Sequence, residues 1–170
     1  DDIARGAAAV SASGSDGSRS GWDVALVRMP WQRQVGPTCG LTALRMARGV
    51  LSRGAAGKGD DDAGLLRTAA QLGFTSDGEM FSAHALADVA ASCCGLNAVV
   101  LRFAGMTAAH VAAIIRSGHL LLVPYDRGAG NSEPALRGGT AAHWCVIVGL
   151  LAPGGSTCGS DSDARGTETG

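Results

Sequence analysis

This sequence of 170 residues has few aromatic residues and almost no net charge. Aromatics make up 4% of it, and 14 basic side chains face 15 acidic ones, for a net charge of −1. Without a basic cluster, the chain has no electrostatic footprint for a phosphate backbone, so no nucleic-acid partner is expected. No apolar run approaches the ~18 residues of a membrane span, so no membrane partner is expected either.

Regularly spaced cysteines are also missing. The five cysteines, an odd number, include no Cys-x-x-Cys pair and stand at positions 39, 93, 94, 145 and 158. This is not the disulfide framework of a small secreted domain, and it predicts a reduced chain in the cytoplasm. Cysteines and histidines do not recur at the intervals of zinc ligands, so we expect no metal and no cofactor. The adjacent Cys93 and Cys94 are poorly placed for a relaxed disulfide and are expected to pack at a helix end.

Three regions follow from the distribution of large apolar side chains. Residues 1–20 are rich in Ala, Gly, Ser and Asp and are predicted to be disordered. Residues 153–170 return to the same low complexity. Residues 21–152 carry the apolar patterns and are expected to form one folded domain.

Within this domain, the patterns predict helices and strands in an order typical of an α+β fold. Helices are expected over residues 39–51, 63–72, 82–93 and 107–117, the third capped by Ser82 and the fourth by Thr107. Strands are expected over residues 22–29, 98–103, 119–125 and 143–151, with a long glycine-rich loop at 126–142. We expect the first helix to pack on an antiparallel sheet.

A possible nucleophile stands at the start of the first helix. Residues 34–46 read Gln-Val-Gly-Pro-Thr-Cys-Gly-Leu-Thr-Ala-Leu-Arg-Met, so Cys39 lies between a turn and an apolar pattern of helical spacing. Unpaired backbone N–H groups and the helix dipole favour negative charge there, so a thiolate is stabilised. A thiolate attacks a carbonyl carbon, but it needs an acid to protonate the leaving group.

His143 is the candidate for that acid. It opens a predicted strand at the exit of the glycine-rich loop, while Trp144, Val146 and Val148 alternate behind it. An early Cys on a helix start and a late His at a strand start have the chain order of papain-like cysteine peptidases. Upstream of the cysteine, Gln34 offers an amide N–H₂ for the oxyanion of a tetrahedral intermediate, and Gln32 could do the same.

Structural interpretations compete with these roles. Cys39 could be a small buried residue, His143 an ordinary histidine at a strand edge, and Gln34 a solvated loop residue. A residue that would orient His143 is the weakest point: Asp161 and Asp163 follow it, but they lie in the low-complexity tail, where solvated charges are the favoured interpretation. The other three histidines and the cysteine of the predicted strand are expected to be structural or solvent-facing: His84, His110, His119 and Cys145.

Four stretches give the chain its resemblance to a known family. They are residues 34–46, Gly-Glu-Met-Phe-Ser at 78–82, Leu-Leu-Leu-Val-Pro-Tyr-Asp at 120–126, and Asn-Ser-Glu-Pro at 131–134 followed by Ala-His-Trp-Cys-Val-Ile-Val-Gly at 142–149. With them the chain resembles the actin maturation proteases, which belong to the C39-like branch of papain-fold cysteine peptidases. The resemblance spans roughly residues 30–151.

The resemblance implies a papain-like fold and a cysteine aminopeptidase that removes the acetylated N-terminal Met or Cys from immature actin, exposing an acidic N-terminus. It implies Cys39 as nucleophile, His143 as general acid and base, and Gln34 as oxyanion donor. Family members continue with further strands, so the chain is expected to be C-terminally incomplete. The loops at 74–81 and 126–142 are the expected walls of the substrate pocket. Two alternatives stay open: a C39-like peptidase with another substrate, such as a leader peptide, and an inactive truncated homologue that only binds actin.

Overall fold

A computed structural model of the chain describes residues 22–52, 62–130 and 133–153. Its elements are, in chain order, β1 (Trp22–Leu26), α1 (Cys39–Leu51), α2 (Asp62–Gln71), α3 (Ala83–Cys94), α4 (Ala108–Arg116), β2 (Leu121–Arg127), β3 (Pro134–Ala135), β4 (Ala142–Ile147) and β5 (Gly149–Pro153). The predictions for residues 1–20 and for the tail after residue 153, with Cys158, Asp161 and Asp163, lie outside the described residues.

All four predicted helices are present, and two of them, α3 and α4, begin after the predicted caps. Ser82 Oγ accepts the backbone N–H of Ala85 at 3.3 Å ahead of α3. Thr107 Oγ1 accepts the backbone N–H of His110 ahead of α4, while the His110 ring accepts the N–H of Thr107. These caps satisfy N–H groups that the first helical turn leaves without partners. Over the described residues, no helix is long and apolar enough to cross a membrane.

The strands form two antiparallel sheets. The larger has the order β3–β2–β4, and the smaller pairs β1 with β5. In the larger sheet, Tyr125 lies opposite His143, and Val123 lies opposite Cys145. Directly opposed residues point to the same face of a sheet, so this register fixes which side chains accompany His143. The α+β fold with antiparallel sheets is therefore confirmed.

The predicted strand at residues 143–151 is in fact two strands in different sheets. β4 ends at Ile147, and β5 begins at Gly149. At the crossing, the backbone N–H of Val27 donates to the carbonyl oxygen of Val148 at 2.7 Å. A side chain at residue 149 would overlap the carbonyl oxygen of Ala25, so the glycine allows the chain to approach β1 closely. Apolar periodicity alone does not register such a break, because both halves are strands.

The prediction of a strand at residues 98–103 is wrong. These residues belong to neither sheet. Among them, Val99, Leu101 and Phe103 are 74%, 48% and 54% exposed. The apolar residues are present, yet in the described part of the chain no neighbouring strand supplies the ladder hydrogen bonds that would make this segment a sheet strand.

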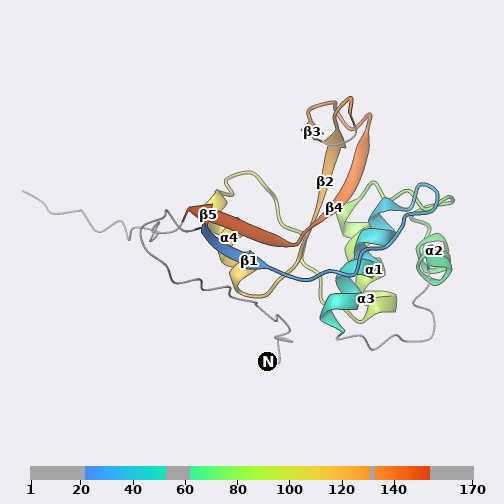
Figure 1. The fold of residues 1–170 in the computed structure, drawn as a ribbon. Coiled ribbons are helices and arrows are strands. Elements are labelled where there is room, and N and C mark those ends of the chain that lie inside the picture. The colour runs from blue at the N-terminus through green and yellow to red at the C-terminus, as the bar shows by residue number, and fades with distance from the viewer. Residues whose placement is uncertain (1–21, 53–61, 131–132, 154–170) are drawn as a thin grey trace, which may run out of the picture.

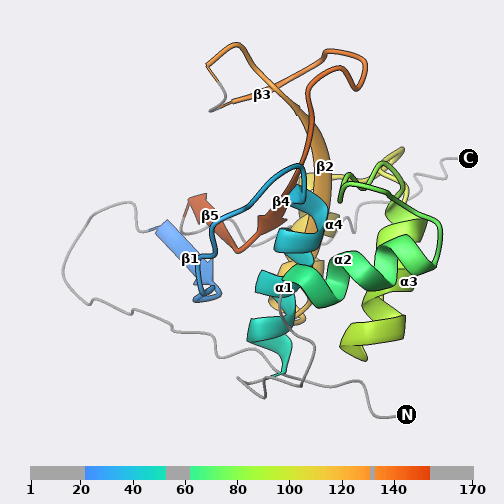
Figure 2. The same ribbon diagram turned by 90° about the vertical axis from the view of Figure 1, so that its right-hand side faces the viewer.

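The main core lies between the first three helices and the larger sheet (Figure 1). α1 packs on β4, and α2 and α3 pack on α1. The most deeply buried large side chains of this core are Leu41, Leu65 and Val89. On the other side of β4, α4 lies against β5, away from α1–α3 (Figure 1). The ends of β2 and β4 nearest β3 extend beyond the helices in both ribbon views (Figure 1, Figure 2). The β2–β4 hairpin projects between these two groups of elements.

Candidate active site

Cys39 is the first residue of α1, as predicted, and its side chain is partly exposed. The preceding turn is fixed by Thr38, which is 5% exposed and donates its hydroxyl to the carbonyl oxygen of Val35 at 2.9 Å. The first residue of a helix has no intrahelical acceptor for its backbone N–H. Cys39 thus combines an accessible thiol with an N–H group that can donate to a ligand.

Residues 78–80 pack against both chain neighbours of Cys39. Gly78 has φ 108°, a conformation that favours glycine, and a side chain there would collide with the methyl group of Thr38. The Cβ atom of Met80 lies only 3.0 Å from where a Cβ on Gly40 would stand. The small size of Gly78 and Gly40 therefore lets this segment run directly alongside the start of α1.

Trp144 connects β4 to the same place. Its indole N–H donates to the carbonyl oxygen of Met80 at 2.6 Å, and the ring is 8% exposed. Its Cδ1 atom lies 3.1 Å from the position of a Cβ on Gly40. Because Trp144 follows His143 and Gly40 follows Cys39, these contacts bring the backbones of the two candidate residues into one region.

The side chains of Cys39 and His143 are not joined. In the described part of the chain, no hydrogen bond connects them, and strand alternation puts His143 on the opposite face of β4 from Trp144. On that face, the His143 ring packs edge-on against Tyr125, with centroids 5.6 Å apart and an angle of 76° between the planes. The structure thus brings the two backbones into one region, and the pairing of the Cys39 and His143 side chains stays a prediction.

The electrostatics of His143 favour its neutral form. Burial lowers the pKa of His143 below its ordinary value of 6.5, and the positive charge of Arg127 lowers it further. Arg127 is two residues after Tyr125 on β2, which places it on the same face. A neutral imidazole at neutral pH can accept a proton from a thiol.

Gln34 is partly buried and held within its own turn. Its side-chain nitrogen donates to the carbonyl oxygen of Gly36 at 2.6 Å. An amide nitrogen carries two hydrogens, so one N–H remains for another acceptor. The side-chain oxygen of Gln32 is buried, and no donor among the described residues bonds to it.

The other candidates differ from these in their surroundings. Cys145 donates its thiol to the carbonyl oxygen of Val123 at 3.5 Å, and burial raises its pKa. The sulfur atoms of Cys93 and Cys94 are 4.0 Å apart, and no disulfide joins them. The described residues contain no group of three or more His, Cys, Asp and Glu side chains that could hold a metal ion.

Two residues of the loops expected to wall the substrate pocket had no individual role in the prediction. Asp126 accepts backbone N–H groups of Arg137 and Gly139 at 3.0 and 2.8 Å, and it also bonds Ala141. It thereby shapes the β2–β4 connection, one residue from Tyr125.

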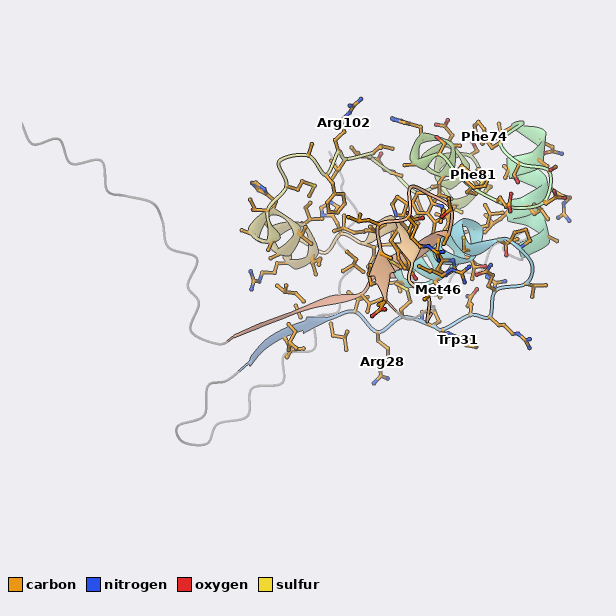
Figure 3. All side chains as sticks on the ribbon, turned by 90° about the horizontal axis from the view of Figure 1, so that it is seen from above. Arg28, Trp31, Met46, Phe74, Phe81 and Arg102 are labelled. Atoms are coloured by element: carbon orange, nitrogen blue, oxygen red, sulfur yellow. The ribbon has the colours of Figure 1, made fainter. Side chains whose placement is uncertain are left out.

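Phe81 is 78% exposed directly after Met80, and it lies with Phe74 on one side of the ribbon, whereas Trp31 and Met46 lie on the other (Figure 3). The sequence did hold a signal for Phe81, because the residue lies in the stretch at 78–82 that carries the family resemblance.

Comparison with known proteins gives a consistent family. Residues 29–151 match the family described as actin maturation protease-like, C-terminal domain. The chain is 39% identical over 132 residues to the actin maturation protease of Bos taurus, covering 76% of this chain and 37% of that protein. It is 37% identical to that of Homo sapiens over 76% of this chain and 36% of the relative. For Danio rerio, the identity is 40% over 69% of this chain and 38% of the relative.

The chain thus spans less than two-fifths of the length of these curated relatives. No solved structure matches it.

Proposed function

The chain belongs to the actin maturation protease-like family, and on that premise we propose that it is a cysteine-type aminopeptidase acting on immature actin. Its reaction is removal of the acetylated N-terminal Met or Cys, in the cytoplasm where immature actin is made. The observation that carries the proposal is the position of Cys39 at the start of α1, whose neighbour Gly40 contacts the residue after His143. Residues 21–152 are the peptidase unit, with α1 on the sheet as in a papain-like fold.

Cys39 is the nucleophile of this proposal, and His143 is its proton acceptor. The lowered pKa of His143 keeps the ring neutral, so it can take the thiol proton as the sulfur attacks the carbonyl carbon of the first residue. The negative oxygen of the tetrahedral intermediate then needs donors. The backbone N–H of Cys39 and the second N–H of the Gln34 amide are the groups we assign to it.

The remaining steps follow from the balance of bonds and protons. The peptide C–N bond breaks, His143 gives its proton to the new amine of actin, and the acetylated amino acid stays on Cys39 as a thioester. Water then attacks the thioester carbon and loses a proton to His143. The C–S bond breaks, the thiol is restored, and the acetyl-amino acid leaves. Phe81, which is exposed and follows Met80, is the residue we assign as an apolar contact for the first side chain.

Mass spectrometry of acetyl-Met-Asp and acetyl-Cys-Asp actin peptides after incubation with the protein tests this function. We expect release of the acetyl-amino acid by the native chain and a loss on the order of a thousandfold or more in Cys39→Ala and His143→Gln, because the reacting groups act as a unit. Cys145→Ala is the matched control and should retain activity, since its thiol is bonded to the Val123 carbonyl. Circular dichroism checks that each variant is folded. Continued processing by a folded Cys39→Ala would overturn the proposal.

A further inference from the structure

Arg127 carries a positive charge that the described residues do not neutralise. Its Nε atom is buried, and no acceptor in the described part of the chain bonds to it. The neighbouring carboxylate of Asp126 forms other hydrogen bonds: its two oxygens accept the backbone N–H groups of residues 137, 139 and 141. The side chain as a whole is partly exposed, but a buried N–H donor without an acceptor is costly.

The position of Arg127 connects this charge to the candidate site. Arg127 and Tyr125 are two residues apart on β2, so they share a sheet face, and Tyr125 lies directly opposite His143. The charge also acts on His143, whose pKa it lowers in addition to the effect of burial. A ligand that reacts at His143 therefore approaches a guanidinium group with unused donors.

We propose that Arg127 binds the carboxylate of the acidic residue that follows the scissile bond of the substrate, and so selects for an acidic new N-terminus. This inference rests on the proposed function, because that substrate has its acidic residues on the leaving side of the bond. An arginine suits the role, since its planar group offers parallel N–H donors that match the two oxygens of a carboxylate. The bound carboxylate would also neutralise the charge that faces His143.

Binding to the Cys39→Ala protein tests the inference without requiring catalysis. The probes are two peptides that differ only in the second residue, acetyl-Met-Asp-Ala-Ala and acetyl-Met-Asn-Ala-Ala, titrated calorimetrically. We expect the Asp peptide to bind about tenfold more tightly or better, as hydrogen bonds between charged groups are stronger than neutral ones. In the double variant Cys39→Ala/Arg127→Gln, this ratio should fall to about one, with the Asn peptide nearly unaffected.

Arg102→Gln is the matched control for the loss of one positive charge. Arg102 is exposed and extends away from the ribbon (Figure 3), so its variant should keep the full preference for Asp. An Asp preference that survives Arg127→Gln, or an equal loss in Arg102→Gln, overturns the inference. So does equal binding of the two peptides to the Cys39→Ala protein. Failure of the native chain to cleave acetyl-Met-Asp-Ala-Ala, with the Arg127-dependent preference intact, would instead count against the peptidase activity alone.

Discussion

Trp144 shows how much of the site depends on a single side chain. Its ring fills the space that Gly40 leaves open, and its N–H is the partner of the Met80 carbonyl. The residue thereby holds three separate stretches together: the start of α1, the 78–80 segment and β4. Cys39 and His143 are each one residue from this contact.

Replacing Trp144 with Phe should destabilise the protein by about 1–3 kcal/mol, because the Met80 carbonyl oxygen would remain buried without a donor. Urea denaturation followed by circular dichroism measures this change. Trp31→Phe makes the same substitution at a residue that is 81% exposed, and it should change stability by less than about 0.5 kcal/mol. Equal effects of the two substitutions would contradict the role given to the indole hydrogen bond.

The charge of Arg127 gives a second prediction at this scale, on pH. Because Arg127 lowers the pKa of His143, Arg127→Gln should raise that pKa toward 6.5, although burial, the larger cause, remains. With a folded-state pKa below that of unfolded histidine, stability decreases as pH falls from 6.5 through the folded-state value. The variant should lose less stability over this window. Titration of the His143 ring protons by NMR measures the shift, and an unchanged or lower midpoint would show that the two groups do not interact as described.

At the scale of the elements, the connection between β2 and β4 is held by hydrogen bonds to a residue of β2, Asp126. The Asp126 carboxylate accepts three backbone N–H groups from it, and Gly128 donates its N–H to the carbonyl oxygen of Glu133 at 2.7 Å. These bonds lower the pKa of Asp126, the one from Gly139 most. The part of this connection at residues 137–141 is therefore tied to the end of β2, beside Tyr125.

Asp126→Ala should loosen this connection while leaving the β2–β4 ladder intact. Hydrogen exchange at the amides of Arg137 and Gly139 should accelerate about tenfold or more, whereas ladder amides such as that of Val123 should keep their rates. In the native chain, the same loosening should begin only as pH falls below 3.8, since the bonds stabilise the charged carboxylate. Asp88→Ala, at an exposed position of α3, is the control. Unchanged exchange at Gly139 would be evidence against the carboxylate contacts.

Local features of the fold could be predicted from the sequence, whereas contacts between distant segments could not. The helices and two of their caps were predictable because Ser82, Thr107 and the apolar spacing of α1 act within a few residues. The division of residues 143–151 between two sheets was not, because it depends on β1, which is distant in sequence. The contact of Met80 with Gly40 and Trp144 was likewise hidden, since nothing local in residues 78–82 reveals which helix they pack against. The position of Arg127 on the same sheet face as His143 was not predictable either, because it depends on the register of β2 and β4.

For the whole molecule, burial is unevenly distributed. The main core unites α1, α2 and α3 with β2 and β4. The region of β1, β5 and α4 contributes few buried side chains, with Ala112 and Ile115 on α4, and leaves Val24, Leu26 and Leu151 about half exposed or more. Regions with little buried apolar surface open at a lower free energy than the core.

Native-state hydrogen exchange at increasing denaturant should therefore separate the two regions. The amide of Val27, which is bonded to the Val148 carbonyl at the junction of the sheets, should become exposed at a lower denaturant concentration than the amide of Leu44 in α1. Amides of α4 should open with Val27. If all of these amides instead share one denaturant dependence, the protein opens as a single cooperative unit and the division is wrong.

The pairing of β1 with β5 also has a consequence in time. These strands are the first and last that the structure describes, so their ladder closes nearly the whole length of the described chain. During synthesis, β1 leaves the ribosome long before its partner exists, and the apolar side chains of Val24 and Leu26 must wait uncovered until β5 emerges. The helices α1, α2 and α3 can meet earlier, because contacts of short sequence separation cost less chain entropy to close. The Cys39 helix is thus assembled in the early part of folding, and the sheet that joins the two ends is completed last.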